Sequence, residues 1–343
     1  MDRFLLAGVM GWPVMHSRSP ALHNYWFAQS RLAGTYVPLA IRPGDLESAL
    51  RALAPLGFSG CNLTIPHKER ALAIVDAVDP VARRIGAISC VVVRPDGSLS
   101  GTNNDCYGFV QNILQHHPDW RADRGPIAVI GAGGGARAVV YSLAERGARD
   151  IRVVNRTVER ADALAREFGP PVYVIAWDER HRALEGAAML VNTTSQGMVG
   201  QPPLDLDLGR LPTSALVCDI VYVPLDTPLL AAARLRGNRT VDGLGMLLHQ
   251  ARPAWHAWFG LEPQVPMVMT LINAGYADNV MLSSDLARPN AIKRNDGPGY
   301  AKTLTVFVPK LKQAGASDEV LRQIMVDNPR RFLAFVPKKR RPV

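Results

Sequence analysis

The segment 127–140, IAVIGAGGGARAVV, constrains the fold of this chain more than any other segment. An apolar run typical of a buried strand leads into Gly131, Gly133 and Ala136, in G-x-G-x-x-A spacing, and then into a helical pattern. The first glycine permits a tight turn, the second lets the backbone approach a pyrophosphate, and the small third residue lets the helix pack on the strand. In this context the motif predicts a dinucleotide-binding unit rather than an ordinary glycine-rich turn.

The next predicted strand ends where a dinucleotide fold places the group that contacts the adenosine ribose. This position has no acidic residue and instead carries Asn155, Arg156, Thr157 and Arg160. Two guanidinium groups suit a 2′-phosphate, because arginine offers charge-assisted, bidentate donors to phosphate oxygens. NADP is therefore the predicted cofactor, and the alternative is that these arginines simply form a solvated helix face.

Two later apolar strands run into polar or proline-rich segments, VNTTSQGM at 191–198 and CDIVYVPLDTPLL at 218–230. Ligands bind outside the carboxyl ends of such strands, so both segments suit the nicotinamide half of the cofactor. Each could equally be a plain turn. The predicted rim residues are Thr193, Thr194, Ile220 and Tyr222.

Strand-like and helical patterns alternate in two series, one over residues 4–105 and the other from residue 126 onwards. Such alternation predicts βαβ units, and so an α/β fold with mainly parallel sheets in two domains. A turn at Asp96 and Gly97 separates two further strands in the first series.

The net charge of +9 does not indicate a nucleic-acid-binding protein, because residues 277–343 hold 13 Lys and Arg against 6 Asp and Glu, a net of +7. The final PKKRRPV has no interleaved aromatic residues. No apolar run approaches the roughly 20 residues of a membrane helix, no leader pattern opens the sequence, and the cysteines are scattered. We therefore expect a cytoplasmic protein with no membrane partner and no zinc site.

The segment NLTIPHKER at 62–70 places Lys68 after a β-branched run and Pro66, and before a helical pattern. A lysine at a helix start is disfavoured by the macrodipole, which suggests a purpose other than helix stability. A solvated surface lysine is the simpler alternative.

Three other polar residues precede or begin predicted helices. Ser17 and Ser19, two positions apart, could bind a polyhydroxylated or carboxylated ligand or could cap a helix. Asp105 lies at another helix start, where an acidic residue is a favoured cap.

Taken in order, these segments resemble the shikimate dehydrogenase family over residues 4–275. The resemblance is carried by GVMGWPVMHSRSPALHN, GCNLTIPHK, RRIGAI, NNDCYG, GAGGGARA, NRTVERA, NTTSQGM, DIVYVPLDTPLL and DGLGMLLHQARPAWHAWFG. It implies a substrate-binding domain at 1–105 and 240–276 and a Rossmann-type, doubly wound NADP-binding domain at 106–239. It also implies reversible, NADP-dependent reduction of 3-dehydroshikimate to shikimate, in the pathway to chorismate and aromatic amino acids, by a monomer or homodimer.

The same resemblance assigns roles to single residues. In the family a lysine and an aspartate face each other over the substrate, which maps onto Lys68 as the acid/base residue and onto Asp105. The family's substrate ligands map onto Ser17, Ser19, Thr64 and Gln250. Its NADP contacts map onto the loop Gly131, Ala132, Gly133, Gly134, Gly135 and Ala136, onto Asn155–Arg160, and onto Gly243 and Met246 near the nicotinamide.

One departure lies inside this site. Family members commonly have asparagine where this chain has Ser89, and serine is shorter with fewer donors. A milder change puts Asn103 or Asn104 where threonine is usual. Shikimate is expected first, and quinate or an aminated relative second. An inactive NADP(H)-binding sensor is the alternative from another class, although retention of Lys68 and Asp105 argues against it.

The segment 277–337 resembles the last β/α unit of phosphotriesterase-like metal hydrolases, in which Asp285 would match a metal-binding aspartate. The chain has eight histidines but no H-x-H pair, and none of them lies in this segment. One β/α unit cannot close a barrel or build a two-metal site. The tail, residues 277–343, is therefore expected to be a non-catalytic, metal-free relic of gene fusion.

Overall fold

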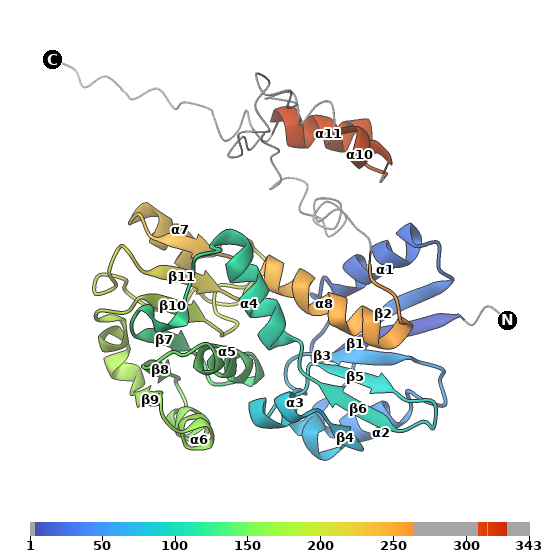
Figure 1. Ribbon diagram of the computed structural model, residues 1–343, viewed down its shortest axis with the longest axis horizontal. Helices are drawn as coiled ribbons and strands as arrows, with labels where there is room; N and C mark the ends of the chain where they lie inside the picture. The colour runs from blue at the N-terminus through green and yellow to red at the C-terminus, as the bar shows by residue number, and fades with distance from the viewer. Residues whose placement is uncertain (1–3, 264–307, 314, 328–343) are drawn as a thin grey trace. The chain divides into compact units, whose positions relative to one another are not determined.

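The computed structural model describes residues 4–263, 308–313 and 315–327 (Figure 1). The chain divides into two compact units. Unit 1 comprises Met1–Pro20 and Thr35–Glu262, and unit 2 comprises Ala21–Gly34 and Pro263–Val343. The predicted strand of the tail and Asp285 lie outside the described residues.

The first sheet of unit 1 has the strand order β2-β1-β3-β5-β6-β4. Its strands are β1 (Leu5–Gly11), β2 (Gly34–Ala40), β3 (Gly60–Leu63), β4 (Ala77–Val78), β5 (Cys90–Val93) and β6 (Leu99–Thr102). Its short helices are α2 (Leu46–Arg51) and α3 (Pro80–Ile85), with the 3-10 turns η1 (Pro43–Asp45) and η2 (Arg70–Ala73).

This sheet is mixed, so the expectation of a mainly parallel sheet is wrong for its second half. β1 pairs with β3, and β4 with β6, in parallel, whereas β5 is antiparallel to both β3 and β6. The cause is the turn predicted at Asp96 and Gly97, where the positive φ of Gly97 reverses the chain between β5 and β6.

The second sheet has the order β12-β11-β10-β7-β8-β9, and every pair in it is parallel. Its strands are β7 (Ile127–Ile130), β8 (Ile151–Val154), β9 (Val172–Ile175), β10 (Met189–Asn192), β11 (Leu216–Asp219) and β12 (Arg239–Val241). Counted from β7, this is the doubly wound order 3-2-1-4-5-6, which confirms the predicted fold class. The direction of winding reverses between β7 and β10, where ligands bind in such sheets.

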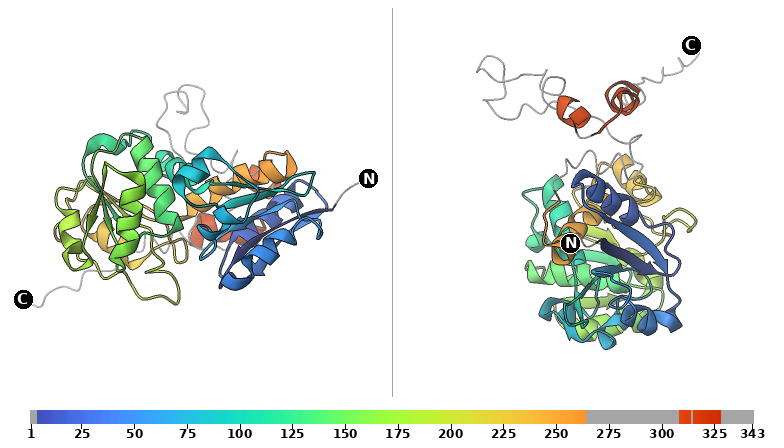
Figure 2. Two further views of the ribbon diagram at one scale, coloured as in Figure 1. Left: turned by 90° about the horizontal axis from the view of Figure 1, so that it is seen from below. Right: turned by 90° about the vertical axis from the view of Figure 1, so that its right-hand side faces the viewer.

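Helices cover both faces of the second sheet (Figure 2). One face packs against α4 (Asp105–His116), α5 (Gly134–Glu145) and α6 (Val158–Phe168). The other face packs against α7 (Pro228–Leu235) and the 3-10 helix η4 (Trp177–Leu184). A third 3-10 turn is η3 (Ala122–Arg124). Because both faces are covered, the central strands β7, β10 and β11 are buried along their whole length and do not alternate between buried and exposed residues.

Two helices join the sheets of unit 1. α4 follows the last strand of the first sheet, and α8 (Leu244–Phe259) follows the last strand of the second (Figure 1). They pack against each other, and Trp258 of α8 donates a hydrogen bond to the Val91 carbonyl of the first sheet.

In unit 2, the described helical segments are most of α1 (Ser19–Gln29), α10 (Val308–Gln313), α11 (Asp318–Arg322) and a π-helical turn η11 (Gln323–Asp327). α11 is capped by Ser317, whose hydroxyl accepts from the Val320 N–H. Among the described residues, no helix is long and apolar enough to cross a membrane.

Candidate active site

Lys68 follows β3 but does not begin a regular helix. The prediction of a helix after Pro66 is therefore wrong. The chain forms only the four-residue turn η2 and then the strand β4. The Lys68 carbonyl accepts from the Ile88 N–H at 2.8 Å, which ties the segment to the neighbouring loop. Tertiary contacts therefore overrode a helical pattern that had no capping residue of its own.

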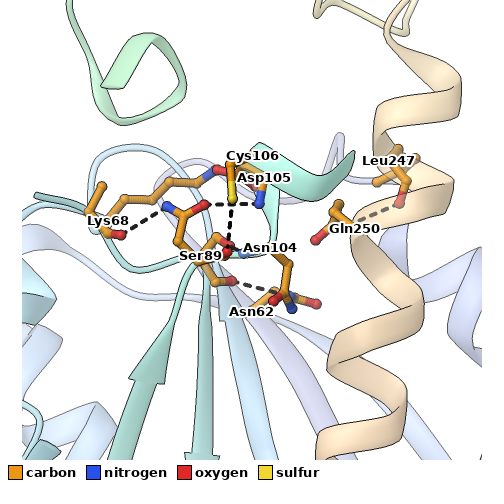
Figure 3. Close-up of polar contacts among 10 residues, drawn as sticks. Asn62, Lys68, Ser89, Asn104, Asp105, Cys106, Leu247 and Gln250 are labelled. Atoms are coloured by element: carbon orange, nitrogen blue, oxygen red, sulfur yellow. Dashed lines mark hydrogen bonds and ion pairs between the residues drawn. The ribbon is translucent and has the colours of Figure 1, made fainter. Parts of the chain in front are cut away.

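Asp105 is the first residue of α4, and its carboxylate does not cap the helix. The N-cap position belongs to Asn104, and Asn103 accepts the Asp105 N–H at 3.0 Å. The carboxylate instead meets Lys68, with Nζ 2.5 Å from Oδ2 (Figure 3). The two side chains are only 17% and 6% exposed, so the pair is held in a largely dry setting. A solvated lysine is thus excluded.

Ser89 lies beside this pair, at the end of a short connection that begins with α3. Asp79 caps α3 by accepting from two backbone N–H groups, and Gly86 ends it in the left-handed conformation. The chain then reaches Ser89, which is 2% exposed. Its hydroxyl oxygen accepts from the Asn104 N–H at 2.8 Å, so this hydroxyl positions the segment that carries Asp105.

Asn62 belongs to the same polar cluster and was missed from the sequence. Its amide donates to the Ser89 carbonyl at 3.1 Å, and its oxygen accepts from the Tyr36 hydroxyl at 2.7 Å. Tyr36 also hydrogen-bonds to the Ser19 side chain, and burial raises the Tyr36 pKa. The one available signal was an amide in the middle of an apolar strand, GCNL.

The other predicted substrate residues have mixed settings. Ser17 accepts from the Ser19 N–H at 3.3 Å, at the start of α1. The methyl group of Thr64 packs against Gly11, where an added Cβ would lie 2.4 Å away. Gln250 is buried on α8 and donates to its own helix, to the Leu247 carbonyl (Figure 3).

The glycine loop after β7 has the shape that the motif predicts. Gly131 has φ +113°, and a Cβ there would lie 2.4 Å from the Thr193 hydroxyl. Gly133 caps α5, and a Cβ on it would meet nothing within 4 Å, which leaves room for a ligand at the helix N-terminus. A Cβ on Gly134 would lie 3.0 Å from Lys68 Cβ. The loop therefore packs directly against Lys68.

The segment after β8 presents the predicted phosphate-binding groups at the surface. Asn155 donates to the Thr157 carbonyl at 2.8 Å, which orders the turn. Arg156 is exposed. Arg160 forms an ion pair with Glu69, 3.4 Å between Nη2 and Oε1, so it contacts the residue next to Lys68.

The predicted nicotinamide rim gathers at the ends of β7, β10 and β11. Thr193 donates to the Ile130 carbonyl at 2.7 Å. Ile220 lies against Gly135, and Gly243 lies against the Ile220 carbonyl. Tyr222 hydrogen-bonds to Ser17, which connects this rim to the substrate segment. Met246, on the first turns of α8, is buried beside them.

Comparison with known proteins bears directly on this geometry. A protein of Paramagnetospirillum magneticum named shikimate dehydrogenase (NADP(+)) is 58% identical over 260 residues, which make up 76% of this chain and 94% of that protein. The chain belongs to the shikimate dehydrogenase family. Family models agree: the shikimate dehydrogenase substrate binding domain matches residues 9–91, and the shikimate / quinate 5-dehydrogenase model matches 114–199.

Solved structures of the family share the fold. Shikimate 5-dehydrogenase from Thermus thermophilus, in complex with NADP(H) and shikimate, is 35% identical with a TM-score of 0.70, covering 79% of this chain and 99% of that one. Quinate dehydrogenase from Corynebacterium glutamicum, in complex with NAD, is 31% identical with a TM-score of 0.72, covering 79% and 98%.

The resemblance of the C-terminal segment is also confirmed, because a phosphotriesterase family model matches residues 243–333. This match begins earlier than expected and includes α8. Within the described part of the chain, no cluster of three or more His, Cys, Asp or Glu side chains is placed to hold a metal ion.

Proposed function

We propose that this chain catalyses the reversible, NADP-dependent reduction of 3-dehydroshikimate to shikimate, with Lys68 and Asp105 as its catalytic residues. The observation that carries the proposal is the contact of one lysine with two partners. Its ammonium meets Asp105 at 2.5 Å, and its stem lies against Gly134 of the cofactor loop. A proton donor for the oxygen and a hydride carrier for the carbon would therefore act on one and the same substrate carbonyl group.

The residues present fit NADP. The open space at Gly133 and the N-terminal amides of α5, which receive no side-chain cap, suit a pyrophosphate, and Arg156 with Arg160 suits a 2′-phosphate. Bound NADPH would supply a hydride to the ring carbon that carries the 3-oxo group, and NADP+ would accept it in the reverse direction.

In this proposal, side chains of the protein transfer the proton. During reduction the Lys68 ammonium donates a proton to the oxygen of the former ketone, so that a C–H and an O–H bond form and the C=O double bond is lost. During oxidation the neutral amine takes the proton back. Asp105 holds the ammonium in place and stabilises its charge.

We further propose that Ser17, Ser19, Thr64, Ser89 and Gln250 bind the hydroxyl and carboxylate groups of the substrate. Ser19, Tyr36, Asn62 and Ser89 support this, because they form one hydrogen-bonded series beside Lys68. In this proposal the substrate domain is 1–105 with 240–276, the NADP domain is 106–239, and the tail 277–343 is non-catalytic. We also propose that the protein is cytoplasmic, which agrees with its four free thiols. Its proposed state is a monomer or a homodimer.

Quinate or an aminated relative is the second candidate substrate, favoured by one observation. The Ser89 hydroxyl oxygen already accepts from the Asn104 N–H, so one donor hydrogen and one acceptor lone pair remain to meet a ring substituent. Such a site discriminates less sharply between rings that differ in one hydroxyl.

The test is NADP+ reduction by the purified chain with shikimate, quinate and aminoshikimate, repeated with NAD+ and in the Lys68→Ala variant. We expect the highest kcat/KM for shikimate with NADP+, and loss of turnover in the variant. A higher kcat/KM for quinate would reassign the substrate. An inactive NADP(H)-binding sensor would bind the cofactor without turning over any of the three, and the variant would then change nothing.

A further inference from the structure

Three polar side chains are buried together where β10 and β11 end. Asn192 and Asp219 are register partners on the two strands, and Thr227 follows in the next loop. Their exposures are 0%, 2% and 0%. Asn192 Nδ2 lies 3.0 Å from Asp219 Oδ1, and the Thr227 hydroxyl donates to Oδ2 at 2.7 Å.

Two members of this cluster, Asn192 and Asp219, also fix backbone turns. The Asn192 oxygen accepts from the N–H and the hydroxyl of Thr194, at 3.0 and 2.8 Å, and its amide donates to the Gln196 carbonyl. Asp219 Oδ1 accepts from the Val221 N–H at 3.0 Å. The carboxylate is thus shared between the loop after β10 and the loop after β11.

Those two loops carry the residues placed at the nicotinamide rim. The Asn192 side of the cluster holds Thr194, and the Asp219 side holds the turn around Ile220. The Gly243 N–H donates to the Val221 carbonyl at 3.1 Å, and a Cβ on Gly243 would lie 2.2 Å from the Ile220 carbonyl. A shift of this turn would therefore move the start of α8 as well.

A carboxylate in such a place is costly to bury. No ion pair to Asp219 is found among the described residues, and burial raises its pKa to about 6, with the nearby Asp242 adding to the effect. An apolar side chain could fill the same space without the free-energy cost of burying a carboxylate. What Asp219 provides is acceptors for three donors on separate segments, which a single apolar group cannot supply.

We propose that Asp219 is a positioning residue that fixes the loops after β10 and β11 relative to each other, and so sets the binding of the nicotinamide half of NADP. The inference rests on the proposed function for the identity of the cofactor. It assigns Asp219 no contact with substrate or cofactor, because its oxygens are occupied by Asn192, Val221 and Thr227.

The test compares two ligands of the purified full chain by calorimetry: NADP+, and adenosine 2′,5′-bisphosphate, which lacks the nicotinamide. In Asp219→Ala we expect the dissociation constant of NADP+ to rise about tenfold, while that of the bisphosphate stays within about twofold. Asp219→Asn should bind NADP+ like wild type, since its oxygen still accepts from Val221 and Asn192 and its amide can donate to the Thr227 hydroxyl.

A matched control separates positioning from stability. Asn238 is another buried polar residue, directly before β12, and its amide donates to the carbonyls of Pro212, Thr213 and Ala215, which precede β11. Asn238→Ala should lower the melting temperature without changing the ratio of the two dissociation constants. Should Asp219→Ala fail to fold, Thr227→Val removes one of the three hydrogen bonds and should shift the same ratio in the same direction.

Equal weakening of both ligands, or no weakening of either, in Asp219→Ala would overturn the positioning role. Because the readout is binding, it is independent of turnover. If wild type binds NADP+ but does not oxidise shikimate, the proposed function fails while the role of Asp219 is still decided.

Discussion

At the scale of single residues, the Lys68–Asp105 pair is the centre of the site. Both side chains are largely buried, and each lacks another charged partner among the ion pairs of the described residues. Removing one partner of such a pair leaves a charge without compensation, which costs more than the pair itself contributes. This energetic balance agrees with the proposed chemical role of the pair and does not suggest a large contribution to stability.

Lys68→Ala should lower kcat for shikimate oxidation by about 10²- to 10⁴-fold, the range expected when an acid/base group is lost. NADP+ affinity should stay within about threefold, because the backbone and Cβ against Gly134 remain. Stopped-flow absorbance measures the first quantity and calorimetry the second. A loss in kcat below about tenfold would mean that another group transfers the proton.

Glu69 forms an ion pair with Arg160, which we propose binds the 2′-phosphate of NADP. Glu69→Gln should tighten NADP+ binding by about two- to fivefold, since an exposed ion pair contributes at most about 1 kcal/mol, and should leave NAD+ binding unchanged. The matched control is Glu185→Gln, which removes the same charge from an exposed pair with Arg210. Equal changes for NADP+ and NAD+ would show that Glu69 does not compete with the phosphate.

At the scale of elements, the N-terminus of α5 lies both at the proposed phosphate space and against Lys68. Gly133 has open space in front of it, whereas Gly134 faces Lys68. Neighbouring glycines of one motif thus face different ligand-binding parts of the site.

Gly134→Ala should lower kcat by about tenfold, because the new Cβ would crowd the stem of Lys68 and move its ammonium. Gly133→Ala should instead raise the KM for NADP+, since its Cβ fills the proposed phosphate space. The control is Gly44→Ala, where a Cβ meets nothing within 4 Å. Steady-state kinetics with both substrates varied separates the two effects, and a Gly134→Ala enzyme with unchanged kcat would contradict the packing argument.

The buried cluster of Asn192, Asp219 and Thr227 predicts that the stability of the protein depends on pH. The native pKa of Asp219 is raised to about 6 from an unfolded value of 3.8, mainly by burial. The native state binds this proton more tightly than the unfolded state does. Protonation of Asp219 therefore makes its full contribution to the free energy of unfolding below a pH of about 4, and this contribution is lost as the pH rises through about 6. The melting temperature of wild type should therefore fall relative to that of Asp219→Asn between pH 4 and 7. Parallel curves for the two proteins would show that Asp219 titrates normally.

At the scale of the whole molecule, the similarity to curated shikimate dehydrogenases covers about three quarters of the chain, and a phosphotriesterase family model matches its C-terminal part. The related protein from Paramagnetospirillum magneticum is covered to 94% of its length by 76% of this chain. Unit 2 combines residues of α1 with the described tail helices.

Deletion of residues 277–343 should leave kcat/KM for shikimate within about twofold, because the proposed catalytic residues all lie before residue 262. Metal analysis of the full chain should show no more bound zinc, manganese or cobalt than the deleted form. Thermal unfolding of both forms distinguishes lost folding from lost catalysis. A well-folded deletion variant without activity, or stoichiometric metal in the full chain, would contradict a non-catalytic tail.

The sequence alone determined the features that depend on local backbone chemistry. The run Ile127–Ala136 indicated a buried strand, a tight glycine turn and a helix start, and the observed φ of Gly131 agrees. The parallel pairing of the second sheet followed from the alternation of apolar strands and helices, and its doubly wound order was implied by the family resemblance. The sequence also indicated the turn at Gly97, but it did not indicate the antiparallel pairing of β5 with β6 across that turn.

Only the tertiary structure decided which distant groups meet. Residues 68–78 have a helical pattern but form a turn and a strand, because pairing with β6 outweighs a short, uncapped helix. Asn62 and Asp219 gave weak signals, because a buried polar residue is identified only by its partners. Whether Lys68 reaches Asp105, 37 positions later, depends on packing that no local pattern encodes. Local propensities act over a few residues, whereas an active site is assembled by long-range burial and hydrogen bonding.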